Sequence, residues 1–161
     1  MTVTHQIAQL NVARMVAPLE SPELAGFVSA LEPLNAVADA APGFVWRLQT
    51  EEGDATAIRP FDDDMILINM SVWESVEALR EFVYKSSHRD VLRDRRQWFE
   101  QHTGDLYLVL WWVPVGTIPT MDEAKARLEL LQGSGPTADA FTFRETFPPP
   151  AQPAPTGVAE R

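Results

Sequence analysis

The 161-residue chain contains no cysteine. Disulfide bonds, thiolate metal sites and cysteine nucleophiles are therefore excluded together. Basic residues are also scarce, because 13 Lys and Arg stand against 23 Asp and Glu and leave a formal net charge of −10. A surface of this sign repels nucleic-acid phosphates and anionic lipids. We therefore expect a protein that binds neither nucleic acid nor membranes.

Long apolar runs are missing as well. No run reaches the ~18 residues that a membrane-spanning helix requires. The N-terminus lacks a basic stretch followed by an apolar one, so no signal peptide is predicted. These features favour a globular, cytoplasmic protein with one domain over residues 1–147. Five of the thirteen prolines fall within the eight residues that begin at Pro148, which predicts a disordered tail over 148–161.

Motifs for metals and nucleotides are absent too. The three histidines stand at positions 5, 88 and 102 and do not pair at the spacing of zinc ligands. The three aspartates at 62–64 lack the alternating spacing of a calcium loop, and they are typical of a polar hairpin tip. No phosphate-binding loop, dinucleotide motif or hydrolase nucleophile motif occurs. We therefore predict neither a metal site nor a dedicated cofactor.

What the chain does contain is hydrophobic periodicity that changes in a regular order. Alternation predicts strands, and helical spacing predicts helices with capping hydroxyls at Ser21, Ser75 and Thr120. Pro33 is expected to kink or split the first helix, and Gly133 to close the last one. The predicted strands are 5–14, 44–49, 65–72 and 106–113. The predicted helices are 21–40, 75–99 with a break near residue 86, and 120–133.

This order predicts a ferredoxin-like βαββαβ fold of class α+β, with an antiparallel sheet and an extra C-terminal helix. In that plan both helices of the repeated unit cover one face of the sheet. The run LYLVLWWV over 106–113 is nevertheless typical of a strand that is buried on both faces. We therefore expect the other face to meet a second copy of the chain, which predicts an isologous homodimer.

Several motifs are similar to those of the dimeric α+β barrel superfamily. They are Ala41–Phe44, Met70–Ser75, His88 downstream of Phe82, and the pair Trp98-Phe99. Over residues 5–147 the chain resembles an uncharacterised bacterial family related to the antibiotic-biosynthesis monooxygenases. The resemblance implies a dimeric barrel with a small-molecule site. The superfamily includes cofactor-free oxygenases, haem-degrading oxygenases, isomerases, dehydratases and simple binding proteins, so the fold alone does not give the reaction.

The haem-degrading branch of this superfamily uses an Asn on the first strand, a Trp on the second helix and a His beyond it. Asn11 and His88 correspond to two of these by position. Phe82 takes the place of the Trp and brings no hydrogen-bond donor. His88 alone would still permit axial ligation of iron. Haem binding therefore remains an alternative to a site without a cofactor.

His88, Asn11 and Asn69 are the candidate catalytic residues. His88 has helical spacing with inward-facing residues and could act as a general base, or it could be a core histidine bonded to a carbonyl. Asn11 and Asn69 lie on the less apolar faces of their strands, and parity predicts that they face one cavity together with Gln9 and Ser71. Their amides could orient a ligand carbonyl or stabilise an enolate oxygen. Alternatively, these amides satisfy one another or bind water inside the barrel.

Aromatic residues could provide stacking surfaces for a flat ligand, although most aromatic clusters are simply core. Trp111 and Trp112 are adjacent on a strand and must point to opposite faces. Arg95 shares a helix face with His88 and could bind a carboxylate, and Arg47 is a second possible anion anchor. The candidate substrate-binding residues are Trp73, Phe82, Tyr84, Arg95, Trp98 and Trp111.

The preferred hypothesis is a cofactor-independent monooxygenase that acts on planar aromatic or polyketide-like molecules. In this hypothesis His88 removes a proton, Asn11 and Asn69 position the oxyanion, and the resulting carbanion reacts directly with oxygen. A haem-binding or haem-modifying protein is one alternative. A dimer that binds a small molecule without catalysis is the other.

Overall fold

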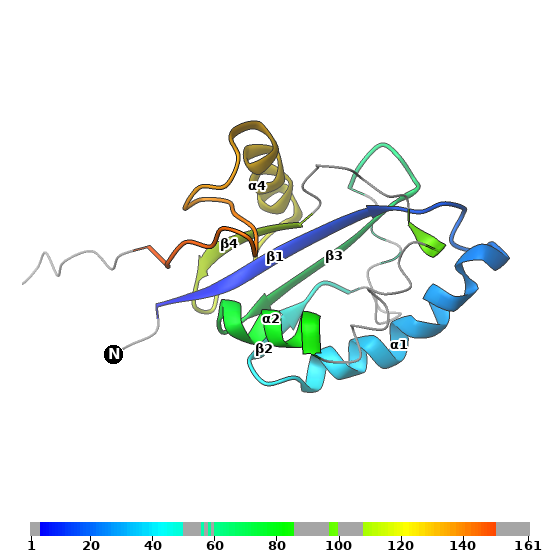
Figure 1. The fold of residues 1–161 in the computed structure, drawn as a ribbon, viewed down its shortest axis with the longest axis horizontal. Coiled ribbons are helices and arrows are strands. Elements are labelled where there is room, and N and C mark those ends of the chain that lie inside the picture. The colour runs from blue at the N-terminus through cyan, green and yellow to red at the C-terminus, as the bar shows by residue number, and fades with distance from the viewer. Residues whose placement is uncertain are drawn as a thin grey trace, which may run out of the picture.

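The computed structural model of the chain describes residues 4–49, 56, 58, 60–85, 97–99 and 108–150. Its strands form a four-stranded antiparallel sheet in the order β2-β3-β1-β4. This order confirms the predicted α+β fold of ferredoxin-like type (Figure 1). The elements are β1 (His5–Arg14), η1 (Pro22–Leu24), α1 (Ala25–Ala40), β2 (Phe44–Arg47), β3 (Ile66–Trp73), α2 (Val76–Lys85), β4 (Leu108–Pro114) and α4 (Met121–Ser134).

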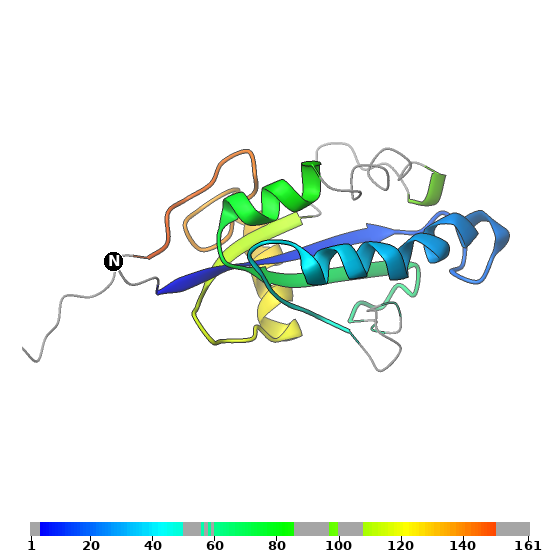
Figure 2. The same ribbon diagram turned by 90° about the horizontal axis from the view of Figure 1, so that it is seen from below.

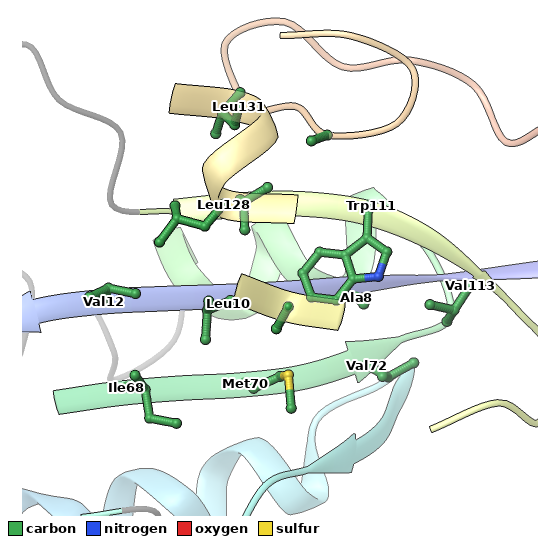
Figure 3. Close-up of a cluster of buried hydrophobic side chains, with 13 residues drawn as sticks. Ala8, Leu10, Val12, Ile68, Met70, Val72, Trp111, Val113, Leu128 and Leu131 are labelled. Carbon is green, nitrogen blue, oxygen red and sulfur yellow. The ribbon is translucent and has the colours of Figure 1, made fainter. Parts of the chain in front are cut away.

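The sheet carries helices on both faces (Figures 1 and 2). On one face Ala38 of α1, together with Val76 and Leu79 of α2, packs against the sheet. On the other face α4 lies across the strands and buries Leu128 and Leu131 (Figure 3). The expectation that helices cover only one face is therefore wrong. The apolar stripe of α4 finds its partner on the sheet of its own chain.

This second face is a closed apolar core. Thirteen buried residues form it, and every one of its strand residues is at most 6% exposed. The exposed face that motivated the sheet-to-sheet homodimer is therefore already covered within one chain, and the homodimer stays a prediction. The strand residues of this core are Ala8, Leu10, Val12, Ile68, Met70, Val72, Val109, Trp111 and Val113.

Two of the three predicted helix caps are present. Ser75 Oγ accepts a hydrogen bond from Ala78 N at 3.1 Å, and Thr120 Oγ1 accepts one from Glu123 N at 3.1 Å. Ser21 does not cap, because its hydroxyl donates to Pro18 O and a short 3-10 turn precedes α1. These caps satisfy backbone N–H groups that the first helical turn leaves unpaired.

Three other predicted boundaries differ in detail. Helix α1 runs through Pro33 as one continuous element. Helix α4 ends one residue beyond Gly133, and Gly135, with φ +74°, is its C-cap. Strand β2 ends two residues before the predicted boundary, although Leu48 N still donates to Met70 O at 2.9 Å, and its register with β3 shifts between Phe44 and Trp46. No described helix has the length and apolar character needed to cross a bilayer.

The turn between α1 and β2 requires a glycine at position 43. Its φ of +83° lies in the left-handed region, which disfavours residues with a Cβ. A Cβ at this position would stand 2.6 Å from the Cβ of Ala78 on α2. The carbonyl of Gly43 also accepts a hydrogen bond from Glu74 N at 2.8 Å. A glycine here lets the turn approach the start of α2 closely.

The segment after α4 returns along the edge of the sheet beside β4 (Figure 1). Phe141 and Leu110 exchange backbone hydrogen bonds of 2.8 and 2.9 Å. Trp112 Nε1 then donates to Phe147 O at 2.9 Å. This segment pairs with an edge that would otherwise present free backbone groups.

Candidate functional site

The face of the sheet beneath α1 and α2 carries a short polar stripe. Strands β1 and β3 pair so that Gln9 lies opposite Ser71 and Asn11 lies opposite Asn69. Because side chains alternate along a strand, these four residues project from the same face. We call Gln9, Asn11, Asn69 and Ser71 the amide row. The four residues therefore share one face, and the expectation that they line one cavity stays a prediction.

Apolar clusters bound the amide row at both ends. Beyond the Gln9–Ser71 pair lies the cluster that contains Ile7 and Trp73. Beyond the Asn11–Asn69 pair the next pair is Ala13–Leu67, and Leu67 belongs to a separate cluster. The buried members of that second cluster are Met15, Leu24, Leu67 and Trp98. The polar stripe therefore interrupts an otherwise apolar face.

A chain of hydrogen bonds orders the amide row. Gln9 Nε2 donates to Asn69 Oδ1 at 2.6 Å and to Ser71 Oγ at 2.8 Å. Trp73 Nε1 donates to the same Ser71 oxygen at 2.9 Å. The two hydrogens of the Gln9 amide are thus both engaged. Part of the alternative foreseen from sequence, that the amides satisfy one another, therefore holds for Gln9 and the oxygen of Asn69.

The outer end of the row remains accessible. Gln9 is 5% exposed and Ser71 6%, whereas Asn69 is exposed and Asn11 half-buried. With its oxygen bonded to Gln9, Asn69 has its amino group left to donate. The side chain of Asn11 forms no hydrogen bond with any residue in the described part of the chain. The row therefore offers amide groups to a molecule outside the sheet.

Trp73 and Phe82 form an aromatic wall beside the buried end of the row. Their rings stack with centroids 5.1 Å apart and an interplanar angle of 26°. Phe44 meets Trp73 edge-on at 5.4 Å. Because Trp73 also bonds to Ser71, the wall and the amide row are one connected unit. The structure thus brings Asn11, Asn69, Trp73 and Phe82 to the same face.

The other described candidates lie elsewhere. Tyr84 is 49% exposed on α2 and meets Phe143 edge-on at 5.8 Å. Trp98 is buried in the cluster at the far end of the face, next to Phe27. Trp111 projects from the opposite face and donates its indole N–H to Glu123 on α4 at 3.1 Å. We leave these three residues out of the candidate site.

The predicted charged groups contribute little to the described site. Arg47 lies on β2 opposite Ser71, but its guanidinium binds the Asp39 carboxylate of α1 at 2.7 and 3.2 Å. That ion pair fastens α1 to the sheet and occupies the predicted anion anchor. His88 and Arg95 lie outside the described residues. Within the described ranges no three metal-ligating side chains come together.

Gln9 is the residue whose importance the sequence conceals. In the sequence it is one polar position among alternating residues, and it stood only as a neighbour of the two asparagines. Its role depends on which strand lies beside β1 and in what register. No sequence signal distinguishes it, because a polar residue between Ala8 and Leu10 fits the ordinary alternation of a strand.

Comparison with known proteins gives a family and a distant structural likeness. The family described as "Domain of unknown function (DUF3291)" matches residues 6–157. No curated protein matches the sequence. A crystal structure of the NE2512 protein of unknown function from Nitrosomonas europaea is 10% identical, with a TM-score of 0.44. The match covers 74% of this chain and 97% of that one, and no inference rests on it.

Proposed function

This chain belongs to the DUF3291 family, and we propose that it binds a planar small molecule through the amide row. The ligand places a carbonyl or enolate oxygen against the amino groups of Asn69 and Asn11. Its ring system lies toward Phe82, the partly exposed member of the aromatic wall, since Trp73 behind it is only 1% exposed. The observation that carries this proposal is the bond from Gln9 to Asn69, which leaves an ordered donor on an accessible amide.

The unusual placement of polar residues supports a binding role. Asparagine is unfavourable inside strands, and a buried glutamine costs free energy unless its hydrogen bonds are made. The neighbouring pairs on the same face are Ile7–Trp73 and Ala13–Leu67, so apolar side chains fit this surface. Residues that do not suit their place in the fold, such as polar residues on an apolar sheet face, occur most often at functional sites. Four such residues in two adjacent cross-strand pairs favour a ligand site over a purely structural one.

The arrangement also suits the oxygenation that the resemblance to monooxygenases implies. A CH₂ group conjugated with the carbonyl loses a proton, and the negative charge moves to the oxygen that the amides hold. The carbanion combines with O₂ to give a hydroperoxide, which loses water. In balance, R₂CH₂ and O₂ give R₂C=O and H₂O, with O₂ as the oxidant. His88 remains the base proposed from sequence.

Two planar probes of similar size test the binding site. Fluorenone carries a carbonyl acceptor, and carbazole carries an N–H donor at the matching position. We expect equilibrium dialysis to show tighter binding of fluorenone. Asn69→Asp replaces the donating amino group by a carboxylate oxygen, so it should weaken fluorenone binding by about tenfold, the effect of one lost hydrogen bond and added repulsion.

The control is Gln6→Leu, which changes an amide on β1 three residues away, on the opposite face. It should leave fluorenone binding unchanged. Equal binding of the two probes by the unmodified protein would contradict the proposed site, as would full fluorenone affinity in Asn69→Asp. Oxygen consumption with anthrone tests the reaction itself. An equal rate in His88→Ala would remove the proposed base.

A further inference from the structure

The side-chain amide of Asn69 can face a ligand in two ways that differ in chemistry but hardly in shape. One edge of the amide accepts hydrogen bonds and the other donates them, and half a turn about the Cβ–Cγ bond exchanges the two. Because Asn69 is exposed, solvent by itself favours neither orientation of its amide. Among the described residues, the side chain of Asn69 has a single hydrogen-bond partner, which is Gln9.

We infer that Gln9 is the residue that sets the hydrogen-bond polarity of the site, and therefore selects acceptor ligands over donor ligands. This inference rests on the proposed function for the ligand, and it names the class selected: uncharged planar molecules with an acceptor oxygen at one edge. Gln9 acts through Asn69 and is a positioning residue. It holds the oxygen of Asn69 inward, and the amino group of Asn69 is what the ligand meets.

Gln9 is held by two bonds, one on each side. The Ser71 oxygen accepts from the indole N–H of Trp73 and has a second lone pair for the Gln9 amino group. The Gln9 amino group donates to that same oxygen at 2.8 Å and, with its second hydrogen, to Asn69 at 2.6 Å. Gln9 and Ser71 are both at most 6% exposed, so water competes little for these bonds. These hydrogen bonds link the buried indole of Trp73 to the accessible amide of Asn69.

Gln9→Glu tests the inference, because it keeps the shape of the side chain and removes its donors. A carboxylate at position 9 only accepts, so Asn69 must turn its amino group inward and present its oxygen. We expect the ratio of fluorenone to carbazole affinity to fall by about tenfold and the preference to reverse. Gln6→Glu adds the same charge to the opposite face of β1 and should leave the preference unchanged.

The pH profile distinguishes this role from a merely structural one. The reversed preference of Gln9→Glu should hold at the alkaline end of the pH range, because burial at position 9 raises the pKa of the new carboxyl group above its ordinary value. Protonation at lower pH restores a donor at position 9, so the preference for fluorenone should return as the pH falls. The unmodified protein should keep its preference over the same range. A Gln9→Glu variant that prefers fluorenone throughout would overturn the inference.

A second measurement needs neither a ligand nor a variant. In the unmodified protein, NMR should show a coupling across the hydrogen bond from Gln9 Nε2 to the side-chain carbonyl of Asn69. A coupling in the reverse direction, from Asn69 Nδ2 to the side-chain carbonyl of Gln9, would overturn the inference, even if Gln9→Glu failed to fold. If the unmodified protein binds neither probe, the proposed function fails, while the direction of this coupling still decides the role of Gln9.

Discussion

The two faces of the sheet are built by the same strands but serve different ends. Toward α4, thirteen buried apolar residues close the face, and the indole N–H of Trp111 is paired with Glu123 of α4. Toward α1 and α2, the amide row separates two apolar clusters. Adjacent residues of one strand thus belong to a sealed core and to an accessible polar stripe. The closed face supplies stability, so the other face can tolerate polar residues that a core would exclude.

The largest expected effect on the free energy of unfolding comes from placing a polar residue on the apolar face, compared with an apolar residue on the polar face at the neighbouring position. Leu10→Gln places an amide among the apolar residues of the α4 face and should lower the free energy of unfolding by about 3 kcal/mol. Gln9→Leu, one residue away, should change it by no more than about 1 kcal/mol. Urea unfolding followed by circular dichroism measures both, with Leu10→Met as a volume-matched control. Similar losses in the two variants would contradict the distinction between the faces.

Two tryptophans sharpen the comparison with a smaller effect. Trp111→Phe and Trp73→Phe each remove one indole N–H bond, to Glu123 and to Ser71 respectively. Each should lower the free energy of unfolding by about 2 kcal/mol, because both indoles are at most 1% exposed and the smaller ring leaves a cavity as well as an unpaired acceptor. Only Trp73→Phe should also weaken fluorenone binding, because Trp73 bonds to Ser71 of the amide row and packs beneath Phe82. Equilibrium dialysis checks this difference, and weaker binding in Trp111→Phe would show that the faces are coupled.

The smallest effect concerns Asp63, at the end of the sheet where β1 leaves it. The Arg14 guanidinium, at 2.7 Å, and the backbone N–H of Met65 hold the pKa of the Asp63 carboxyl below its ordinary value of 3.8. A lowered folded-state pKa means that the stabilisation is complete above the unfolded value and is lost as the pH falls through the folded value. Both side chains are more than a third exposed, so the effect is small.

Asp63→Asn should therefore flatten the loss of thermal stability in acid while lowering the melting temperature slightly near neutral pH. Differential scanning calorimetry across the acid range checks this expectation. Asp62→Asn, at the neighbouring position, provides the control. An unchanged acid profile in Asp63→Asn would show that the Arg14 contact contributes nothing to stability.

Much of the fold could be predicted because it depends on local patterns. Alternation placed β1 and β3, and the hydroxyl caps at Ser75 and Thr120 fixed the starts of two helices. The two-residue period of a strand placed Asn11 on the face of Gln9 and Asn69 on the face of Ser71, and the pairing of β1 with β3 makes these one face. The cap predicted at Ser21 is wrong, because a hydroxyl before a proline can either cap a helix or bond within a turn. In the structure it bonds to Pro18 O within a turn.

The sequence by itself determined the elements, their order and the parity of the polar residues, since these depend on neighbours a few positions apart. The tertiary structure decided where α4 packs, and so which face is closed. It also decided that Gln9, β1's buried amide, holds the oxygen of Asn69, sixty residues away. Pairing between distant segments depends on register and layer order, and a single strand's periodicity contains neither.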